Sequence, residues 1–74
     1  PMEFKTVYNR GKLRLHTGDT EGALADLDKA TTLKPQHAGA HECFGDALTQ
    51  AGKEMEAAIQ YRLAEELRKR KNNS

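Results

Sequence analysis

The sequence predicts an all-α fold of four helices, arranged as two stacked, antiparallel helix–turn–helix units. Three observations indicate this fold. Apolar residues recur at three- and four-residue intervals along most of the chain, which is the spacing of amphipathic helices. No segment shows the alternation of apolar and polar residues that is typical of a strand. The second half of the chain, residues 38–71, also repeats the pattern of residues 4–37 at a constant offset.

Length and composition restrict the class of protein. The chain has 74 residues, enough for one small domain or for a fragment of a longer array. Twelve basic and eleven acidic residues nearly cancel, so we expect no nucleic-acid partner. No apolar run approaches the roughly 20 residues of a membrane span, and we expect no membrane partner. The single cysteine cannot form an internal disulfide, which favours a reducing, cytoplasmic location.

Residues 4–37 form the first predicted unit. Helical spacing covers residues 3–17, and Gly18 ends this helix because glycine adopts the left-handed cap conformation without strain. Asp19 then offers a side-chain oxygen to the first free amides of a second helix, which Pro35 terminates. Three charged residues of this second helix are expected on its solvent-exposed face: Asp26, Asp28 and Lys29.

Residues 38–71 form the second predicted unit. Its first helix begins near Ala38, at a weak start signal, and closes at Gly52. Its second helix runs from Glu54 to about Lys71. No proline follows this helix as Pro35 follows its counterpart, so the helix is free to run on.

The two ends of the chain fall outside the repeated units. Pro1 before Met2 looks like a cloning remnant, so residues 1–3 are set aside as a leader. Residues 72–74 are expected to fray. The basic run 68–71 stands at a helix C-terminus, where the helix dipole favours cations. It is interpreted as a solubilising helix end, with a patch for localisation or for an acidic partner as the alternative.

The two units match at positions where helices must approach closely. Gly11 and Ala23 are small, which allows the two helices of one unit to pack together. Ala30 is small, which allows the first helix of the next unit to lie against the second helix. The matched pairs, all separated by the same offset, are Gly11 and Gly45, Gly18 and Gly52, Ala23 and Ala57, Leu27 and Tyr61, Ala30 and Ala64, and Leu33 and Leu67. Stacking of the two units is therefore expected to form the core.

This pattern resembles the tetratricopeptide repeat (TPR) family, whose 34-residue helix–turn–helix motif it follows over nearly the whole chain. Arg10 and Arg14 depart from the motif at apolar positions, and Lys69 stands where the motif has proline. The resemblance implies a short right-handed solenoid. The first copy reads Val7-x2-Arg10-Gly11-x2-Arg14, then Ala23-x3-Leu27, Ala30 and Pro35, and the second reads His41-x2-Phe44-Gly45-x2-Leu48, then Ala57-x3-Tyr61 and Ala64.

The resemblance also implies a function, a protein–protein interaction module or scaffold. In this family a concave groove, lined by the first helix of each unit, holds a protein or peptide segment. The alternative is that these polar residues are only the solvated faces of two amphipathic helices. The residues expected to face the groove are Lys5, Tyr8, Asn9, Lys12 and His16 from the first unit, and Glu42, Cys43, Asp46 and Gln50 from the second. The groove would be basic at one end and acidic at the other.

One specialised form of this groove is the carboxylate clamp, which holds the acidic C-termini of heat-shock chaperones. Asn9 followed by Arg10 matches the middle unit of the clamp. The next unit should then supply a lysine and an arginine, where this chain has Gly39 and Cys43. We therefore expect no complete clamp.

The competing hypothesis is a structural role. No polar capping helix follows Leu67, so the outer face of the last helix is expected to need a cover, either a further repeat or a second copy of the chain in a homodimer. The residues of this face are Met55, Ile59 and Leu63.

Chemistry of other kinds is not expected. His37 and His41 are four residues apart, but one falls in the predicted loop and the other at a packing position, so we expect no metal site. Glu42 and Asp46 would raise the pKa of Cys43, which argues against a nucleophile. The chain also lacks a phosphate-binding glycine-rich loop and a serine–histidine–acid arrangement. We expect neither an enzyme nor a cofactor.

Overall fold

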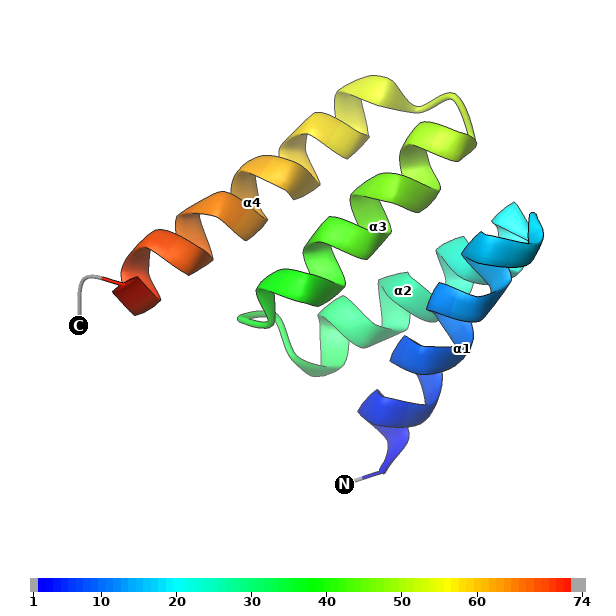
Figure 1. Ribbon diagram of the computed structural model, residues 1–74, viewed down its shortest axis with the longest axis horizontal. Coiled ribbons are helices and arrows are strands. Elements are labelled where there is room, and N and C mark those ends of the chain that lie inside the picture. Colours follow the sequence, from blue (N-terminus) through cyan, green and yellow to red (C-terminus); the bar gives the residue numbers. More distant parts are fainter. Residues whose placement is uncertain (1, 73–74) are drawn as a thin grey trace.

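The structure, a computed structural model, describes residues 2–72. Within that range it contains four α-helices and no strand: α1 (Glu3–Thr17), α2 (Thr20–Leu33), α3 (Ala38–Gln50) and α4 (Glu54–Asn72). Figure 1 shows that they form two antiparallel hairpins, α1 with α2 and α3 with α4. The predicted all-α stack of two helical hairpins is confirmed.

The helices at the chain ends extend one residue into each terminal segment. Glu3 is the first residue of α1, as the helical spacing over residues 3–17 predicted, although the first unit was bounded at residue 4; Asn72 is the last residue of α4. The suggested cloning remnant at Pro1 and the predicted fraying of residues 73–74 lie outside the described residues.

The helices contact one another in chain order. Between residues 2 and 72, α1 packs on α2, α2 on α3 and α3 on α4, while α1 also touches α3. One buried cluster at the junction of the hairpins comprises Val7, Ala30 and Ala40. A second comprises Ala23, Leu27 and Ala47. The small residue Ala30 thus lies beside α3, as the repeat pattern predicted.

Glycine allows the close approach of helices at equivalent positions of the two hairpins. A Cβ atom on Gly11 would lie 2.8 Å from Cγ of Leu27, which is fully buried. A Cβ atom on Gly45 would lie 2.7 Å from Cε1 of Tyr61. Gly45 and Tyr61 are the counterparts of Gly11 and Leu27 in the second copy of the repeat. The close packing predicted from the repeat is therefore present in both hairpins.

The turns within the hairpins also repeat. Gly18 and its counterpart Gly52 have φ angles of 86° and 80°, in the left-handed region that favours glycine. Asp19 then starts α2, because its side chain accepts a hydrogen bond from the Gly22 N–H at 3.1 Å.

The prediction that Asp26 lies on the solvent-exposed face of α2 is wrong. Its residue is only 4% exposed, and its carboxylate accepts hydrogen bonds from two arginines of α1. Arg10 Nε and Nη2 donate at 2.9 Å each, and Arg14 Nη1 donates at 3.1 Å. The two arginines that depart from the apolar TPR pattern therefore have their partner inside the same hairpin. Asp28 and Lys29 are exposed, as expected.

None of the four helices, over the residues that the structure describes, combines the length and the apolar character needed to cross a bilayer.

Candidate functional site

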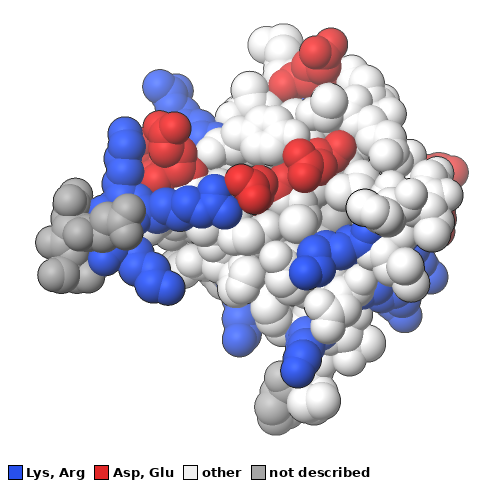
Figure 2. All heavy atoms as spheres, in the orientation of Figure 1, with Lys and Arg blue, Asp and Glu red and all other residues white. Residues whose placement is uncertain are grey.

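The residues predicted to line a binding groove belong to α1 and α3, which touch and lie on the face of the molecule seen in Figure 1. Charge divides this face. Figure 2 shows acidic side chains gathered over α3, with basic side chains over α1 and over the C-terminal end of α4. On this α1–α3 face, some of the nine predicted residues contact other side chains, and others have no partner within residues 2–72.

Tyr8 and Cys43 form the centre of the α1–α3 face. The Tyr8 hydroxyl lies 4.0 Å from the Cys43 sulfur, and the Lys12 ammonium lies 4.6 Å from the centroid of the Tyr8 ring. Burial, together with the neighbouring Cys43, raises the pKa of Tyr8 to about 12. Burial also raises the pKa of the Cys43 thiol, and Asp46 and Glu42 add to this effect, as the sequence predicted. Both groups therefore stay neutral at physiological pH.

The acidic side chains of α3 are engaged by α4. Arg68 donates from Nη1 and Nη2 to the two carboxylate oxygens of Glu42, at 2.9 and 3.3 Å. This arginine holds the pKa of Glu42 below its ordinary value. The Tyr61 hydroxyl donates to Oδ1 of Asp46 at 2.5 Å, and this bond raises the pKa of Tyr61. Half of the charge on the acidic end of the predicted groove is thus balanced within the hairpin.

Gln50 joins the two hairpins. Its Oε1 accepts a hydrogen bond from Thr20 Oγ1, and its Nε2 donates to the carbonyl oxygen of Leu15 at 3.3 Å. Gln50 therefore ties the C-terminal end of α3 to the turn between α1 and α2, in addition to lying on the surface.

The remaining predicted residues lie on α1 and have no side-chain partner within residues 2–72. Lys5, Asn9 and His16 are exposed, and within residues 2–72 none of their side chains forms a hydrogen bond, an ion pair or a ring contact. Together with Lys12 they make α1 the more available half of the α1–α3 face. The structure thus brings Tyr8, Lys12 and Cys43 together and leaves Lys5, Asn9 and His16 exposed to solvent.

The two histidines considered as metal ligands have other partners. His37 is the N-cap of α3, where its Nδ1 accepts a hydrogen bond from the Ala40 N–H at 3.0 Å. His41 is buried, with Nδ1 at 2.7 Å from Gln60 Oε1 and Nε2 at 2.7 Å from the Pro35 carbonyl oxygen. No group of three potential ligands occurs within the described range.

Sequence reasoning missed an aromatic cluster at the edge of the α1–α3 face. Phe4, Tyr8 and His37 lie with ring centroids 4.9 to 5.3 Å apart. The Lys34 ammonium lies 4.7 Å from the centroid of Phe4. Burial and the charge of Lys34 lower the pKa of His37. The available signal was the position of His37 directly before a helix start, which marks an N-cap rather than a free loop residue.

Comparison with protein-family models, with curated proteins and with solved structures found no match.

Proposed function

We propose that this chain is a TPR-type interaction module that binds a protein or peptide segment on its α1–α3 face. The repeated hairpin geometry supports this proposal, because Gly11 and Gly45 occupy equivalent packing positions and Gly18 and Gly52 equivalent turns. Helical repeats of this kind use the surface of successive first helices for binding. The proposed role is recognition without catalysis or a cofactor.

The observation that carries the proposal is that some polar residues of this face are bonded to other side chains and others are not. Glu42 and Asp46 are held by α4, whereas Lys5, Asn9 and His16 have no partner within residues 2–72. Side chains that neither pack nor pair in the free protein are available to a partner. A row of cations and an amide on α1 fits a segment with carboxylates and backbone carbonyls directed at α1.

Tyr8 gives this face an apolar centre. Its ring is half-buried between the hairpins, and its hydroxyl faces the neutral Cys43 thiol. Phe4, His37 and Lys12 contact this ring, so a small or apolar side chain of the partner would meet only the part of Tyr8 that stays exposed, between the basic side chains of α1 and the acidic side chains of α3. The proposed ligand is therefore an extended segment with acidic residues on one side of a central apolar one.

Peptides selected from a random library for binding to the wild-type chain test this proposal. We expect the double variant Lys5→Glu/Lys12→Glu to weaken binding of the selected peptides about tenfold or more, since both charges reverse at the site. The matched control is Lys53→Glu/Arg62→Glu, which changes the charge equally at exposed residues away from this face. Equal binding by all three proteins would refute the proposed face.

A second candidate function is self-association through α4. Met55, Ile59 and Leu63 form an exposed apolar stripe on this helix, and Met55 is 87% exposed. The corresponding residues of the first repeat are Glu21, Ala25 and Lys29, all exposed on α2 although α3 packs on that helix. A further hairpin stacked in the same way would therefore leave the stripe uncovered, so a homodimer is the favoured form of this candidate.

The oligomeric state measured by light scattering tests this second candidate function. A dimer that becomes monomeric in the Ile59→Glu variant is the expected result if the stripe mediates self-association. A wild-type chain that stays monomeric at high concentration would rule it out.

The cellular location stays a proposal as well. A single, half-buried thiol fits a reducing compartment such as the cytoplasm.

A further inference from the structure

Three hollows surround the loop between the two hairpins, on the edge of the molecule where α4 ends. The first, of about 520 Å³, is lined by residues 34–37. The second, of about 410 Å³, lies between Gln36 and the last turns of α4. The third, of about 270 Å³, lies between the start of α3 and the same turns. Because Gln36 lines all three, they form one continuous surface, which is named the loop edge.

The loop edge is basic. Among the described residues that line it, none carries a carboxylate, whereas four are cationic: Lys34 from the loop and Arg68, Arg70 and Lys71 from α4. Glu42 of α3 balances the charge of Arg68 from outside the hollows. Lys34 and Arg70 are exposed and form no ion pair with any residue from 2 to 72. The positive charge of these two residues is therefore not compensated within the described chain.

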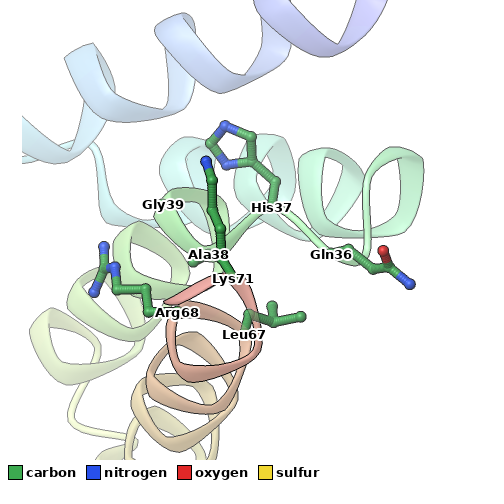
Figure 3. A pocket seen from close by; sticks show the side chains of 7 residues that line it. All are labelled: Gln36, His37, Ala38, Gly39, Leu67, Arg68 and Lys71. Carbon is green, nitrogen blue, oxygen red and sulfur yellow. The ribbon is translucent and has the colours of Figure 1, made fainter. Parts of the chain in front are cut away.

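Apolar groups line the same hollows as these cations. Pro35 lines the first hollow, and Leu67 lines the second and the third. Figure 3 shows Leu67 and Gln36 on one side of the third hollow and Arg68 on the other, with the Lys71 side chain extending toward His37. The loop edge thus offers apolar contact and positive charge within one surface.

We propose that the loop edge docks an acidic peptide segment, one in which carboxylates flank an apolar side chain. The carboxylates would pair with Lys34 and Arg70, and the apolar side chain would contact Pro35 and Leu67. The shape favours a segment over a small metabolite, because the hollows are open and extended, whereas small ligands bind in enclosed pockets.

The aromatic side chains beside the loop edge favour a peptide over a nucleic acid. Binding of single strands depends on aromatic faces that are free to stack on bases. Here the rings of Phe4, Tyr8 and His37 pack on one another, and Lys34 lies over Phe4. These rings are engaged in the fold.

This inference does not depend on the function proposed for the α1–α3 face. The two surfaces adjoin at Tyr8 and His37, which are 5.0 Å apart between ring centroids, but their charged residues differ. Lys5 and Lys12 belong to the α1–α3 face, and Lys34 and Arg70 to the loop edge. Variants of one pair leave the other intact.

Fluorescence anisotropy with defined probes tests the inference. The probe is a labelled peptide in which two glutamates precede and two follow a single leucine. Its control has glutamine in place of every glutamate. We expect the acidic probe to bind the wild-type chain, with an affinity that falls as the salt concentration rises. The glutamine peptide should bind at least about tenfold more weakly than the acidic probe.

Two double variants locate the site. Lys34→Glu/Arg70→Glu should weaken binding of the acidic probe about tenfold or more, while Lys53→Glu/Arg62→Glu, with the same change in charge, should bind as the wild type does. Circular dichroism of both variants confirms that they are folded. An equal loss of affinity for the acidic probe in the two variants would show nonspecific electrostatic attraction and overturn the proposal.

Two further measurements identify the occupant and separate this site from the other face. Binding of a short polyuridine RNA more tightly than the acidic peptide would assign the loop edge to nucleic acid and overturn the proposal. The acidic probe could also fail to bind Lys5→Glu/Lys12→Glu and still bind Lys34→Glu/Arg70→Glu. That result would place acidic binding on the α1–α3 face and overturn the proposal for the loop edge. Retention of the probe in the former variant supports the loop edge whatever happens to the peptides selected for the α1–α3 face.

Discussion

The guanidinium of Arg10 on α1 binds the carboxylate of Asp26 on α2 through two hydrogen bonds of 2.9 Å, one to each oxygen. This planar, two-point contact fixes the rotation and the register of the two helices, which a single apolar contact does not. Arg14 adds a third hydrogen bond to the same carboxylate. The first hairpin therefore has a polar lock next to its apolar contact between Gly11 and Leu27.

Removal of the carboxylate should destabilise the fold. Asp26→Ala is expected to lower the free energy of unfolding by about 2 kcal/mol, because hydrogen bonds from charged donors to a buried acceptor are lost. Urea unfolding followed by circular dichroism measures the change. Asp28→Ala is the control, because Asp28 is exposed two residues away and its side chain forms no ion pair within the described range. An equal effect of both substitutions would contradict the assigned role of Asp26.

The same lock makes stability depend on pH. Hydrogen bonds from Arg10 hold the pKa of Asp26 below its ordinary value of 3.8, although burial opposes this. As the pH falls, Asp26 therefore takes up its proton at a higher pH in the unfolded chain than in the folded protein. The stabilisation is fully present above the ordinary pKa and is lost as the pH falls through the lower pKa of the folded state.

Unfolding of the wild type and of Asp26→Asn, measured between pH 7 and pH 2, checks this dependence. The difference in their free energies of unfolding should stay constant above about pH 5 and shrink as the pH falls below about 4. Glu3 and Glu42, whose pKa values are also lowered by ion pairs, are present in both proteins and cancel in the difference. A difference that does not vary with pH would contradict the prediction.

Alanine at the two helix-contact glycines should have unequal effects. In Gly11→Ala the new Cβ would lie 2.8 Å from the fully buried Leu27, so we expect a net loss of about 1–2 kcal/mol despite the higher helix propensity of alanine. In Gly45→Ala the neighbour is Tyr61, which is 37% exposed and can turn outward with the loss of its exposed hydrogen bond to Asp46, so a smaller loss is expected. Thermal unfolding of both variants gives the comparison. A larger loss at Gly45 would show that Tyr61 is held more rigidly than its exposure indicates.

The thiol of Cys43 should react slowly in the folded protein. Burial raises its pKa, so the thiolate, which is the reacting species, is scarce near neutral pH. We expect the rate of modification by a disulfide reagent at pH 7.5 to rise at least about tenfold when the chain is unfolded in urea. Tyr8→Ala, which removes the side chain that contacts the sulfur, should give an intermediate rate. Equal rates in the folded and unfolded chain would show that Cys43 is neither buried nor perturbed.

The fold was predictable because helix packing depends on residue size and spacing, which the sequence displays directly. Gly11 and Gly45 are recognisable as positions of close helix contact, because glycine destabilises the interior of a helix and is seldom found there without such a reason. The turn glycines Gly18 and Gly52 are recognisable in the same way. Asp26 was misplaced because periodicity assigns charged residues to solvent. Only the structure shows that Arg10 and Arg14 reach it from the preceding helix.

The candidate site was less predictable, because its properties depend on pairing between helices. The sequence placed Glu42 and Asp46 on one surface, but not their contacts with Arg68 and Tyr61, which lie 26 and 15 residues further along the chain. The basic run at the end of α4 was visible as charge. Its position against the loop of residues 34–37 depends on how the second hairpin closes.

The contacts in chain order predict how this protein folds. Since α4 packs on no helix other than α3 within residues 2–72, and each hairpin closes through a short turn, few contacts require distant parts of the chain to meet. Chains with such local topology fold on the order of microseconds to milliseconds. We also expect α4 to open while α1, α2 and α3 remain packed, so its amides should exchange with solvent earliest.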